Sequence, residues 1–318
     1  MGKEKILITG AAGQLGTVLT KALQNKFGFD NVLASDLVSK TNFNVRFEQL
    51  DATDYNALEQ IVTKYEITQI YHLAAILSAN GEKFPVRTWE VNMKSLFNVL
   101  EISRLHGINK IFYPSSIAVF GSDIEKINTP QSPNLTPETA YGLTKVSGEN
   151  WVNYYHNKYG LDIRSLRYPG VIGYQSLPGG GTTDYAVDIY HKAVKRESYE
   201  CFLEESTILP MIFMDDAIRA TIELMDAPIE NITVRTSYNL AGMSFDPDEL
   251  FNSIKKIYPD FEIIYKPDFR QDIANSWPKT IDDADARKDW GWKPEFDLDS
   301  MSEVMIQKLK EHYNPVTV

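Results

Sequence analysis

Three glycines in the turn after the first apolar segment constrain the fold more than any other feature of the chain. Residues 5–9 have the composition of a short buried strand, and residues 17–23 have the apolar spacing of a helix. The turn between them carries Gly10, Gly13 and Gly16. Such glycines let a pyrophosphate approach the backbone, and the amides at the helix start meet its charge. The strand, turn and helix predict a dinucleotide-binding unit; a turn that only joins strand to helix is the alternative.

A carboxylate follows the second apolar run, where a ribose would be recognised. Asp36 ends residues 31–36, and the residues directly after it include no arginine or lysine. A carboxylate at this place can accept hydrogen bonds from both ribose hydroxyls and repels a 2′-phosphate. We therefore predict NAD rather than NADP as the cofactor. A helix cap or turn role for Asp36 is the alternative.

Strand-like runs alternate with helical patterns through the first half of the chain. The further expected strands are residues 45–50, 69–73, 110–113 and 162–167, and the expected helices are residues 54–65, 86–106 and 140–159. This order predicts an α/β fold with a doubly wound parallel Rossmann sheet. The regularity ends beyond Pro169. We therefore place an NAD-binding Rossmann domain at 1–169 and a smaller mixed α/β substrate-binding lobe at 170–318, some of whose segments return to the main domain.

Composition narrows the possible partners. The formal net charge of −11 argues against a nucleic acid or a membrane surface as partner. The single cysteine, Cys201, excludes a disulfide framework and a thiolate metal site, and the five histidines have no ligand spacing. No signal peptide or long apolar stretch is recognisable. We therefore expect a cytoplasmic protein without a bound metal.

Tyr141 and Lys145 are the candidates for acid–base chemistry. They lie four residues apart in a predicted helix, so their side chains share one face. A lysine ammonium beside a phenol is expected to lower the phenol pKa from about 10, which favours a general base near neutral pH. Ser115 and Ser116 follow the strand 110–113, and a hydroxyl there can bind the oxygen from which Tyr141 takes a proton. A solvated helix face and ordinary turn chemistry are the alternatives.

Taken together, these motifs resemble the extended short-chain dehydrogenase/reductase family. The shared features, in chain order, are the glycine turn, Asp36, Asp51, residues 72–75, Asn92, the two serines and Tyr141-x-x-x-Lys145. By this resemblance Tyr141 is the acid/base, Lys145 holds the nicotinamide ribose and stabilises the phenolate, and Ser116 fits the family's hydroxyl position better than Ser115. The expected NAD-binding residues are Gly10, Gly13, Gln14, Leu15, Gly16, Asp36, Asp51, Ala52, Leu73, Ala74, Ala75, Asn92, Tyr141, Lys145 and Tyr168.

The resemblance also implies a homodimer. Helices 86–106 and 140–159 carry apolar and aromatic residues on more than one face, including Phe97, Trp151 and Tyr154. In this family the corresponding helices form a four-helix interface. Packing of these residues against their own sheet is the alternative.

Residues 174–186 carry the substrate prediction, since they resemble the L-threonine 3-dehydrogenases of the short-chain type. The glycines 179–181 can bring backbone amides near a carboxylate, Thr182 and Thr183 supply hydroxyls, and Asp184 can oppose an ammonium. The resemblance implies NAD-dependent oxidation of the β-hydroxyl of L-threonine by hydride transfer, giving 2-amino-3-ketobutyrate. The expected substrate-binding residues are Ser78, Ser116, Tyr141, Gly179, Gly180, Thr182, Thr183, Asp184 and Trp277.

Two other functions stay open. A nucleotide-diphospho-sugar 4-epimerase or dehydratase of the same family would need basic residues for the diphosphate. Arg219, Arg235, Arg270 and Arg287 form no cluster in the sequence. A non-catalytic NAD-binding sensor would keep the glycine turn but would not require Tyr141.

Overall fold

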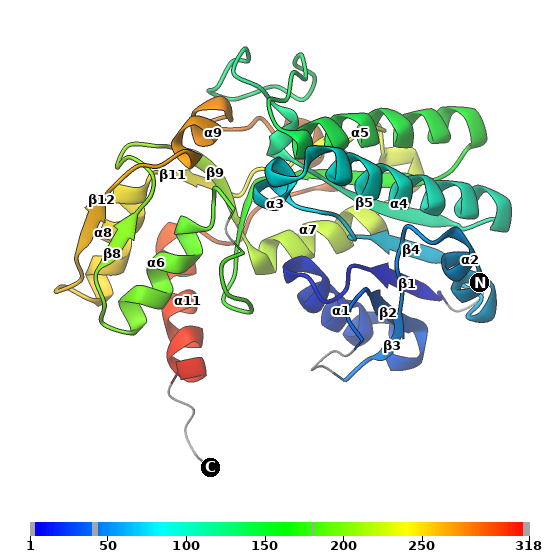
Figure 1. Cartoon of the computed structure of the whole chain (residues 1–318), viewed down its shortest axis with the longest axis horizontal. Helices are drawn as coiled ribbons and strands as arrows, with labels where there is room; N and C mark the ends of the chain where they lie inside the picture. The colour runs from blue at the N-terminus through cyan, green and yellow to red at the C-terminus, as the bar shows by residue number, and fades with distance from the viewer. Residues whose placement is uncertain (1–3, 40–43, 180, 314–318) are drawn as a thin grey trace. The chain divides into compact units, whose positions relative to one another are not determined.

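The computed structural model of the chain describes residues 4–39, 44–179 and 181–313 (Figure 1). The chain divides into two compact units. The first unit comprises residues 1–119, 139–167 and 220–238, and the second comprises residues 120–138, 168–219 and 239–318. Each unit is therefore assembled from segments that are far apart in the sequence.

A seven-stranded sheet forms the centre of the first unit. Its strand order is β10-β6-β5-β4-β1-β2-β3. The strands are β1 (Ile6–Thr9), β2 (Val32–Asp36), β3 (Arg46–Gln49), β4 (Gln69–His72), β5 (Lys110–Ser116), β6 (Ile163–Tyr168) and β10 (Tyr238–Asn239). β1 pairs in parallel with both β2 and β4, so Ile6 lies opposite Val32 and Gln69. All four residues of β1 and of β4 are buried, as strands covered on both faces require. The predicted doubly wound Rossmann sheet is confirmed.

Helices between the strands have local start and stop signals. They are α1 (Gln14–Phe27), α2 (Tyr55–Lys64), α3 (Ser78–Lys83), α4 (Pro85–His106), α5 (Ala140–Tyr159) and α7 (Met214–Asp226), with the short helices η1 (Phe29–Asn31), η2 (Ile117–Val119) and η3 (Ile229–Asn231). The Thr139 hydroxyl accepts a hydrogen bond from the Gly142 amide at 3.0 Å and so caps α5. Gly107 and Gly160 end α4 and α5 in the left-handed conformation. Figure 1 shows α4 and α5 running side by side, and they contact each other extensively.

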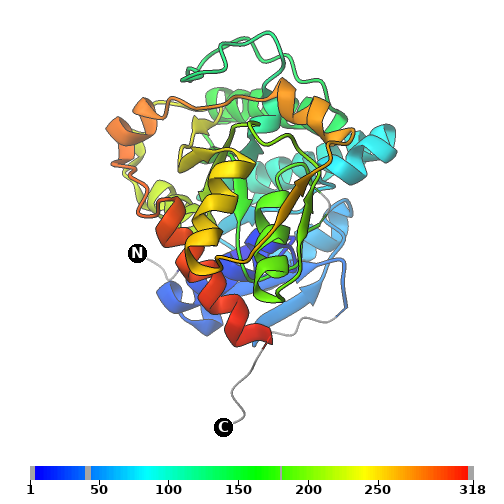
Figure 2. The same cartoon turned by 90° about the vertical axis from the view of Figure 1, so that its left-hand side faces the viewer.

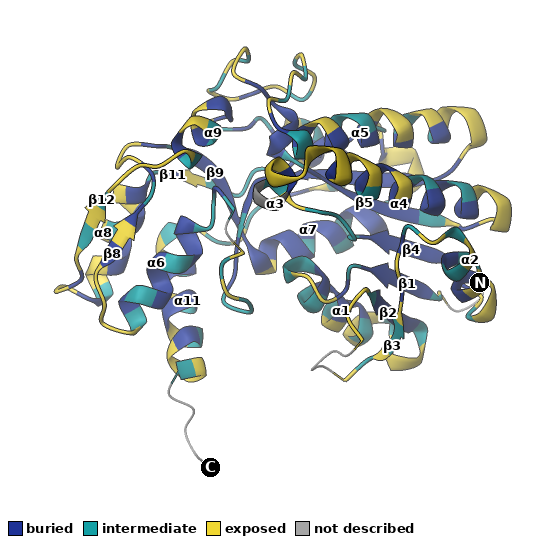
Figure 3. Ribbon diagram, viewed as in Figure 1, coloured by how far each residue is buried: buried dark blue, intermediate teal, exposed yellow. Residues whose placement is uncertain are grey.

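The core of the first unit is formed by apolar side chains from both layers. Figure 3 shows the central strands of the sheet buried and the outer faces of the helices exposed, whereas the edge strand β3 has no buried residue. Leu7, Ile70 and Ile111 from three strands pack with Leu96 and Val99 from α4. No helix in the described part of the chain is long and apolar enough to cross a membrane.

The second unit contains two small sheets and a group of helices. The sheets are β11-β9-β7, formed by Met243–Phe245, Leu209–Phe213 and Gly170–Ile172, and β12-β8, formed by Ile263–Tyr265 and Tyr199–Cys201. The helices are α6 (Tyr185–Val194), α8 (Pro247–Ile257), α9 (Arg270–Ser276), α10 (Ala284–Trp290) and α11 (Leu298–Tyr313). Asp246 and Glu249 form a capping box at the start of α8. Figure 2 shows α6, α8 and α11 together, and each contacts the other two.

Candidate active site

The glycine turn after β1 has no room for side chains at two of its three glycines. Gly10 has φ of +72°, and a Cβ on it would lie 2.6 Å from the backbone nitrogen of Ala74. A Cβ on Gly16 would lie 2.3 Å from the Gly10 carbonyl oxygen. At Gly13 the nearest atom would be an ordinary 3.4 Å away. Gly10 and Gly16 are therefore required for close packing, and the partly exposed residues Gln14 and Leu15 begin α1 beside them.

Asp36 lies beside this turn. It is the last residue of β2, and its Oδ2 accepts a hydrogen bond from the Ala12 amide at 2.9 Å. The carboxylate is partly exposed, so one face remains open to a ligand. Asp51 is exposed after β3, and its Oδ1 accepts hydrogen bonds from the amide and the hydroxyl of Thr53, both at 2.8 Å. Asp36 thus ends one parallel strand and Asp51 follows another, and ligands bind at this edge of such sheets.

Asn92 on α4 organises the segment that follows β4. Its Oδ1 accepts a hydrogen bond from the Ile76 amide at 2.7 Å, and its Nδ2 donates to the Ile76 carbonyl at 3.0 Å and to the Thr144 hydroxyl at 3.2 Å. Asn98, which sequence reasoning missed, donates to the Ala52 carbonyl at 3.0 Å. The side-chain amides of Asn92 and Asn98 thus hold the backbone of the segments that follow β4 and β3, where the cofactor is expected to bind.

His72, at the end of β4, is a buried neutral group. Its Nδ1 is 2.9 Å from the Thr9 hydroxyl and its Nε2 is 3.4 Å from the Ser95 hydroxyl. Burial, together with the smaller effect of the nearby Lys145 charge, lowers the pKa of His72 to about 3. His72 therefore ties β1, β4 and α4 together without carrying charge.

Ser116 and Tyr141 are brought together, and Ser115 is turned elsewhere. Ser116, at the end of β5, lies close enough to Tyr141, in the first turn of α5, for its hydroxyl to act on the pKa of the phenol. The Ser115 hydroxyl donates instead to Oε1 of Glu149 at 2.6 Å. Consecutive residues of a strand point to opposite faces, which explains the difference. The geometry favours Ser116 as the hydroxyl partner of Tyr141.

Lys145 is buried one turn beyond Tyr141. Its ammonium donates to the Pro114 carbonyl at 2.6 Å and lies 5.4 Å from the centre of the Tyr141 ring and 4.8 Å from that of Tyr113. Burial lowers the pKa of Lys145 to about 7, and the charge of Glu149 acts in the opposite direction. Lys145 can therefore gain or lose its charge near neutral pH.

The expectation that Lys145 lowers the pKa of Tyr141 is wrong for this structure. Burial raises the pKa of Tyr141 above its ordinary value, and the Ser116 hydroxyl offsets only part of that effect. The physical reason is that both groups are removed from water, which disfavours the phenolate and the ammonium alike. The stability of a Tyr141 phenolate therefore depends on how far Lys145 keeps its positive charge.

The segment expected to bind substrate belongs to the second unit and is held by its own backbone. Asp184 Oδ2 accepts a hydrogen bond from the Gly181 amide at 2.7 Å. Thr182 is buried, Thr183 lies against Gly170, and Gly179 is exposed. Gly180 lies outside the described residues. The roles of these groups toward a substrate stay predictions.

The remaining expected residues are distributed over both units. Ser78 begins α3 and Ala75 lies in the loop before it, both partly buried in the first unit. Tyr168 and Trp277 are buried in the second unit, Tyr168 at the end of β6 and Trp277 directly after α9. Among the described residues no group of three His, Cys, Asp or Glu side chains is arranged to hold a metal ion.

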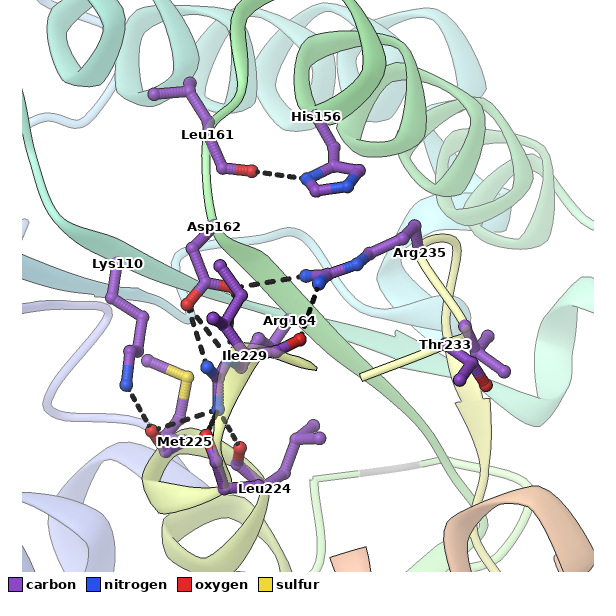
Figure 4. A network of polar contacts seen from close by, with 12 residues as sticks. Lys110, His156, Leu161, Asp162, Arg164, Leu224, Met225, Ile229, Thr233 and Arg235 are labelled. Carbon is purple, nitrogen blue, oxygen red and sulfur yellow. Dashed lines mark hydrogen bonds and ion pairs between the residues drawn. The ribbon is translucent and has the colours of Figure 1, made fainter. Parts of the chain in front are cut away.

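A second polar network lies at the start of β6 (Figure 4). Arg164 donates to Asp162 at 2.8 Å, and its Nη1 donates to the carbonyls of Leu224 and Ala227, both at 2.6 Å. Lys110 donates to the Met225 carbonyl at 2.6 Å. These cations cap the carboxyl end of α7, where unpaired carbonyls accumulate. The donors of Arg164 are engaged by protein groups, so this network is structural.

The fold and this arrangement of side chains define a class of enzyme. The family model of the NAD dependent epimerase/dehydratase family matches residues 6–241, and the chain belongs to that family. The enzymes of this family use NAD, and the glycine turn fits it because Gly10 and Gly16 keep the backbone free of side chains where a pyrophosphate approaches.

Several solved structures that are similar to this chain are L-threonine dehydrogenases. A holo-form GalE-like L-threonine dehydrogenase from Cupriavidus necator is 50% identical, with a TM-score of 0.95, over 96% of this chain and 100% of that chain. A monomeric L-threonine 3-dehydrogenase from a metagenome is 51% identical, with a TM-score of 0.94, over 96% and 99%. An uncharacterized epimerase/dehydratase of Staphylococcus aureus (strain MRSA252) is 44% identical over 313 residues, 97% of each chain.

Proposed function

We propose that the protein is a cytoplasmic L-threonine 3-dehydrogenase that oxidises the β-hydroxyl of L-threonine to 2-amino-3-ketobutyrate. The observation that carries the proposal is the Ser116–Tyr141–Lys145 cluster in a chain that is 50% identical to a threonine dehydrogenase structure over 96% of its length. A family member of unrelated specificity would share the cluster, so the identity over the whole chain supports the choice of substrate.

The reaction assigns one task to each side chain of the cluster. Tyr141 takes the proton of the substrate hydroxyl as general base, and the Ser116 hydroxyl aligns the same oxygen. The Lys145 ammonium stabilises the phenolate. Bound NAD supplies the acceptor for the hydride from the β-carbon. Holding these groups in one geometry removes much of the entropic barrier.

The cofactor and the substrate are assigned to different elements. The glycine turn holds the pyrophosphate, Asp36 holds the adenosine ribose, and Lys145 holds the nicotinamide ribose. Ser78 and the segment 179–184 grip the carboxylate and the ammonium of threonine. Asp184 is the proposed partner of the ammonium, because an anionic side chain matches its charge.

A nucleotide-diphospho-sugar epimerase is the second candidate within the family. Its substrate needs unengaged basic side chains for the diphosphate. Each of the arginines considered for this role already pairs with a carboxylate of its own unit: Arg219 with Asp216, Arg235 with Asp162, Arg270 with Asp268 and Arg287 with Asp283. This pairing favours the smaller substrate. A non-catalytic sensor would require none of the three cluster residues.

A second copy of the chain is the proposed partner of α4 and α5. Trp151, Tyr154 and Tyr159 are 39%, 45% and 43% exposed on α5, which is high for large aromatic side chains. A homodimer through a four-helix bundle would cover them. The metagenome relative is described as monomeric, so the molar mass in solution must be measured.

The decisive assay mixes purified protein with NAD and L-threonine and follows NADH absorbance. We expect threonine-dependent growth of NADH. A parallel reaction with a uridine-diphospho-sugar is the matched control, since an epimerase regenerates NAD in every cycle. Interconversion of the sugar nucleotide, with no NADH from threonine, would refute the proposed function.

A further inference from the structure

Glu149 is a buried carboxylate next to the candidate catalytic lysine. It lies on α5 one turn beyond Lys145 and is 1% exposed. Residues spaced in this way on a helix have Cβ atoms roughly 5–6 Å apart. Glu149 accepts hydrogen bonds from the Ser115 hydroxyl at 2.6 Å and from Nε and Nη2 of Arg167, on β6, at 2.9 and 2.7 Å. These donors, one of them a guanidinium, satisfy the carboxylate inside the protein.

Lys145 has few other sources of negative charge around it. The titratable groups that surround it are Tyr141 and Glu149 on α5, Tyr113 on β5, His72 on β4 and, through Glu149, Arg167 on β6. Burial raises the pKa of both tyrosines and lowers that of His72, so all three are neutral near pH 7. Glu149 is thus the anion that offsets the cost of burying the ammonium.

We propose that Glu149 is a positioning residue of the active site: fixed by its buried pair with Arg167, it favours the charged form of Lys145, and it holds Ser115 while Ser116 faces Tyr141. The proposal rests on the role assigned to Lys145 in the proposed function. Arg167 fixes the carboxylate in place, and the charge of Glu149 then acts across one helical turn on Lys145. Because burial raises the pKa of Tyr141, the phenolate needs this retained charge.

The pair of Asp162 and Arg164 provides a matched comparison on the same strand. Both pairs are buried, with side-chain exposures of 3% and 1% for Arg167 and Glu149 and of 1% and 9% for Arg164 and Asp162. Arg164 caps the end of α7 (Figure 4), whereas Glu149 lies one turn from Lys145. If Glu149 had only a structural role, loss of either pair would lower the stability and leave the titration of Lys145 unchanged.

A titration of Lys145 by NMR tests the charge-setting role without substrate or cofactor. Protein labelled with ¹³Cε-lysine is titrated, and the Lys145 resonance is assigned by its absence in Lys145→Met. We expect the midpoint of Lys145 to fall by at least about one pH unit in Glu149→Gln, since burial is then unopposed. Glu149→Asp should restore most of the midpoint because it restores the charge. Asp162→Asn should leave the midpoint unchanged while lowering the melting temperature.

A variant with both Glu149 and Arg167 replaced keeps the test valid if Glu149→Gln, which leaves Arg167 unpaired, destabilises the fold. Removing one member of a buried pair leaves an unpaired charge, whereas Glu149→Gln with Arg167→Gln leaves none. The Lys145 midpoint should fall in this double variant as well. An unchanged midpoint in a folded Glu149 variant, or an equal fall in Asp162→Asn, would overturn the proposal.

Activity measurements separate this proposal from the proposed function. In Glu149→Gln the alkaline limb of the kcat/KM profile for threonine should move to lower pH by about the same amount, because Lys145 loses its proton earlier. If the wild-type protein does not oxidise threonine, the proposed function fails, and the NMR midpoint still decides the role of Glu149.

Discussion

The residues expected to perform the chemistry and those expected to select the substrate differ in how the fold holds them. Ser116, Tyr141 and Lys145 stand at the end of a central strand and in the first turns of a helix, with contacts to one another and to buried neighbours. Residues 181–184 form a turn in the second unit, and its one carboxylate, Asp184, accepts a hydrogen bond from the Gly181 amide. The cluster is therefore held by buried regular structure, whereas the sequence of the turn can change without altering the contacts of the cluster.

This difference explains how one family serves several substrates. β5 and α5 carry the proposed acid–base residues, so we expect changes there to remove the reaction itself. In the turn 181–184 the Asp184 carboxylate bonds the Gly181 amide, and we expect substitutions in this turn to alter which substrate binds. Variants of the two regions should accordingly affect kcat and KM in different proportions.

The largest effect is expected for Tyr141→Phe. Loss of the proton acceptor should lower kcat for threonine about 10³-fold, within the range of general acid–base catalysis. NADH binding, measured by fluorescence titration, should change less than about threefold because the ring remains. Tyr154→Phe on the exposed face of the same helix is the matched control and should retain activity. Comparable activity in wild type and Tyr141→Phe would exclude Tyr141 as the base.

Replacing each of the two serines at the end of β5 by alanine should affect kcat to a different extent. Ser116→Ala removes the hydroxyl that acts on Tyr141 and is proposed to align the substrate oxygen, so it should lower kcat about 10²-fold. Ser115→Ala leaves Glu149 with one donor fewer, so its main cost should be stability, about 1–3 kcal/mol. Steady-state kinetics and thermal unfolding of both variants measure the contrast. A larger loss of kcat for Ser115→Ala would reverse the assignment.

The spacing of residues in the sequence was enough to predict that Tyr141 and Lys145 of the proposed catalytic cluster lie together. The pair Tyr141 and Lys145 needs only one helix, and α5 spans Ala140–Tyr159 as expected from the apolar pattern. β4 and α4 likewise match their expected positions closely, apart from one residue at an end. Periodicity reports local structure directly, which is why these elements and the parallel sheet could be predicted.

Long-range burial and pairing could not be predicted in the same way. The raised pKa of Tyr141 follows from water exclusion by the whole unit, which no four-residue spacing reports. Glu149 was missed because its partner Arg167 lies on a different element, the strand β6, although a glutamate one turn after Lys145 was visible in the sequence. The ion pairs that engage Arg235 and Arg164 at Asp162 also depend on tertiary structure.

The smallest effect, and the one that tests the segment 179–184, is expected for Asp184→Asn. The asparagine oxygen can still accept the bond from the Gly181 amide, so the turn should persist while the negative charge is lost. If Asp184 opposes the threonine ammonium, KM should rise about tenfold, equivalent to roughly 1.4 kcal/mol of binding. The same variant should keep kcat within about threefold, because the acid–base cluster lies on β5 and α5. Asp188→Asn, on the same helix, controls for the change in net charge. A fall in kcat with unchanged KM would instead place Asp184 among the groups that act in the transition state. The assignment of chemistry to β5 and α5 and of substrate selection to the segment 179–184 would then be wrong.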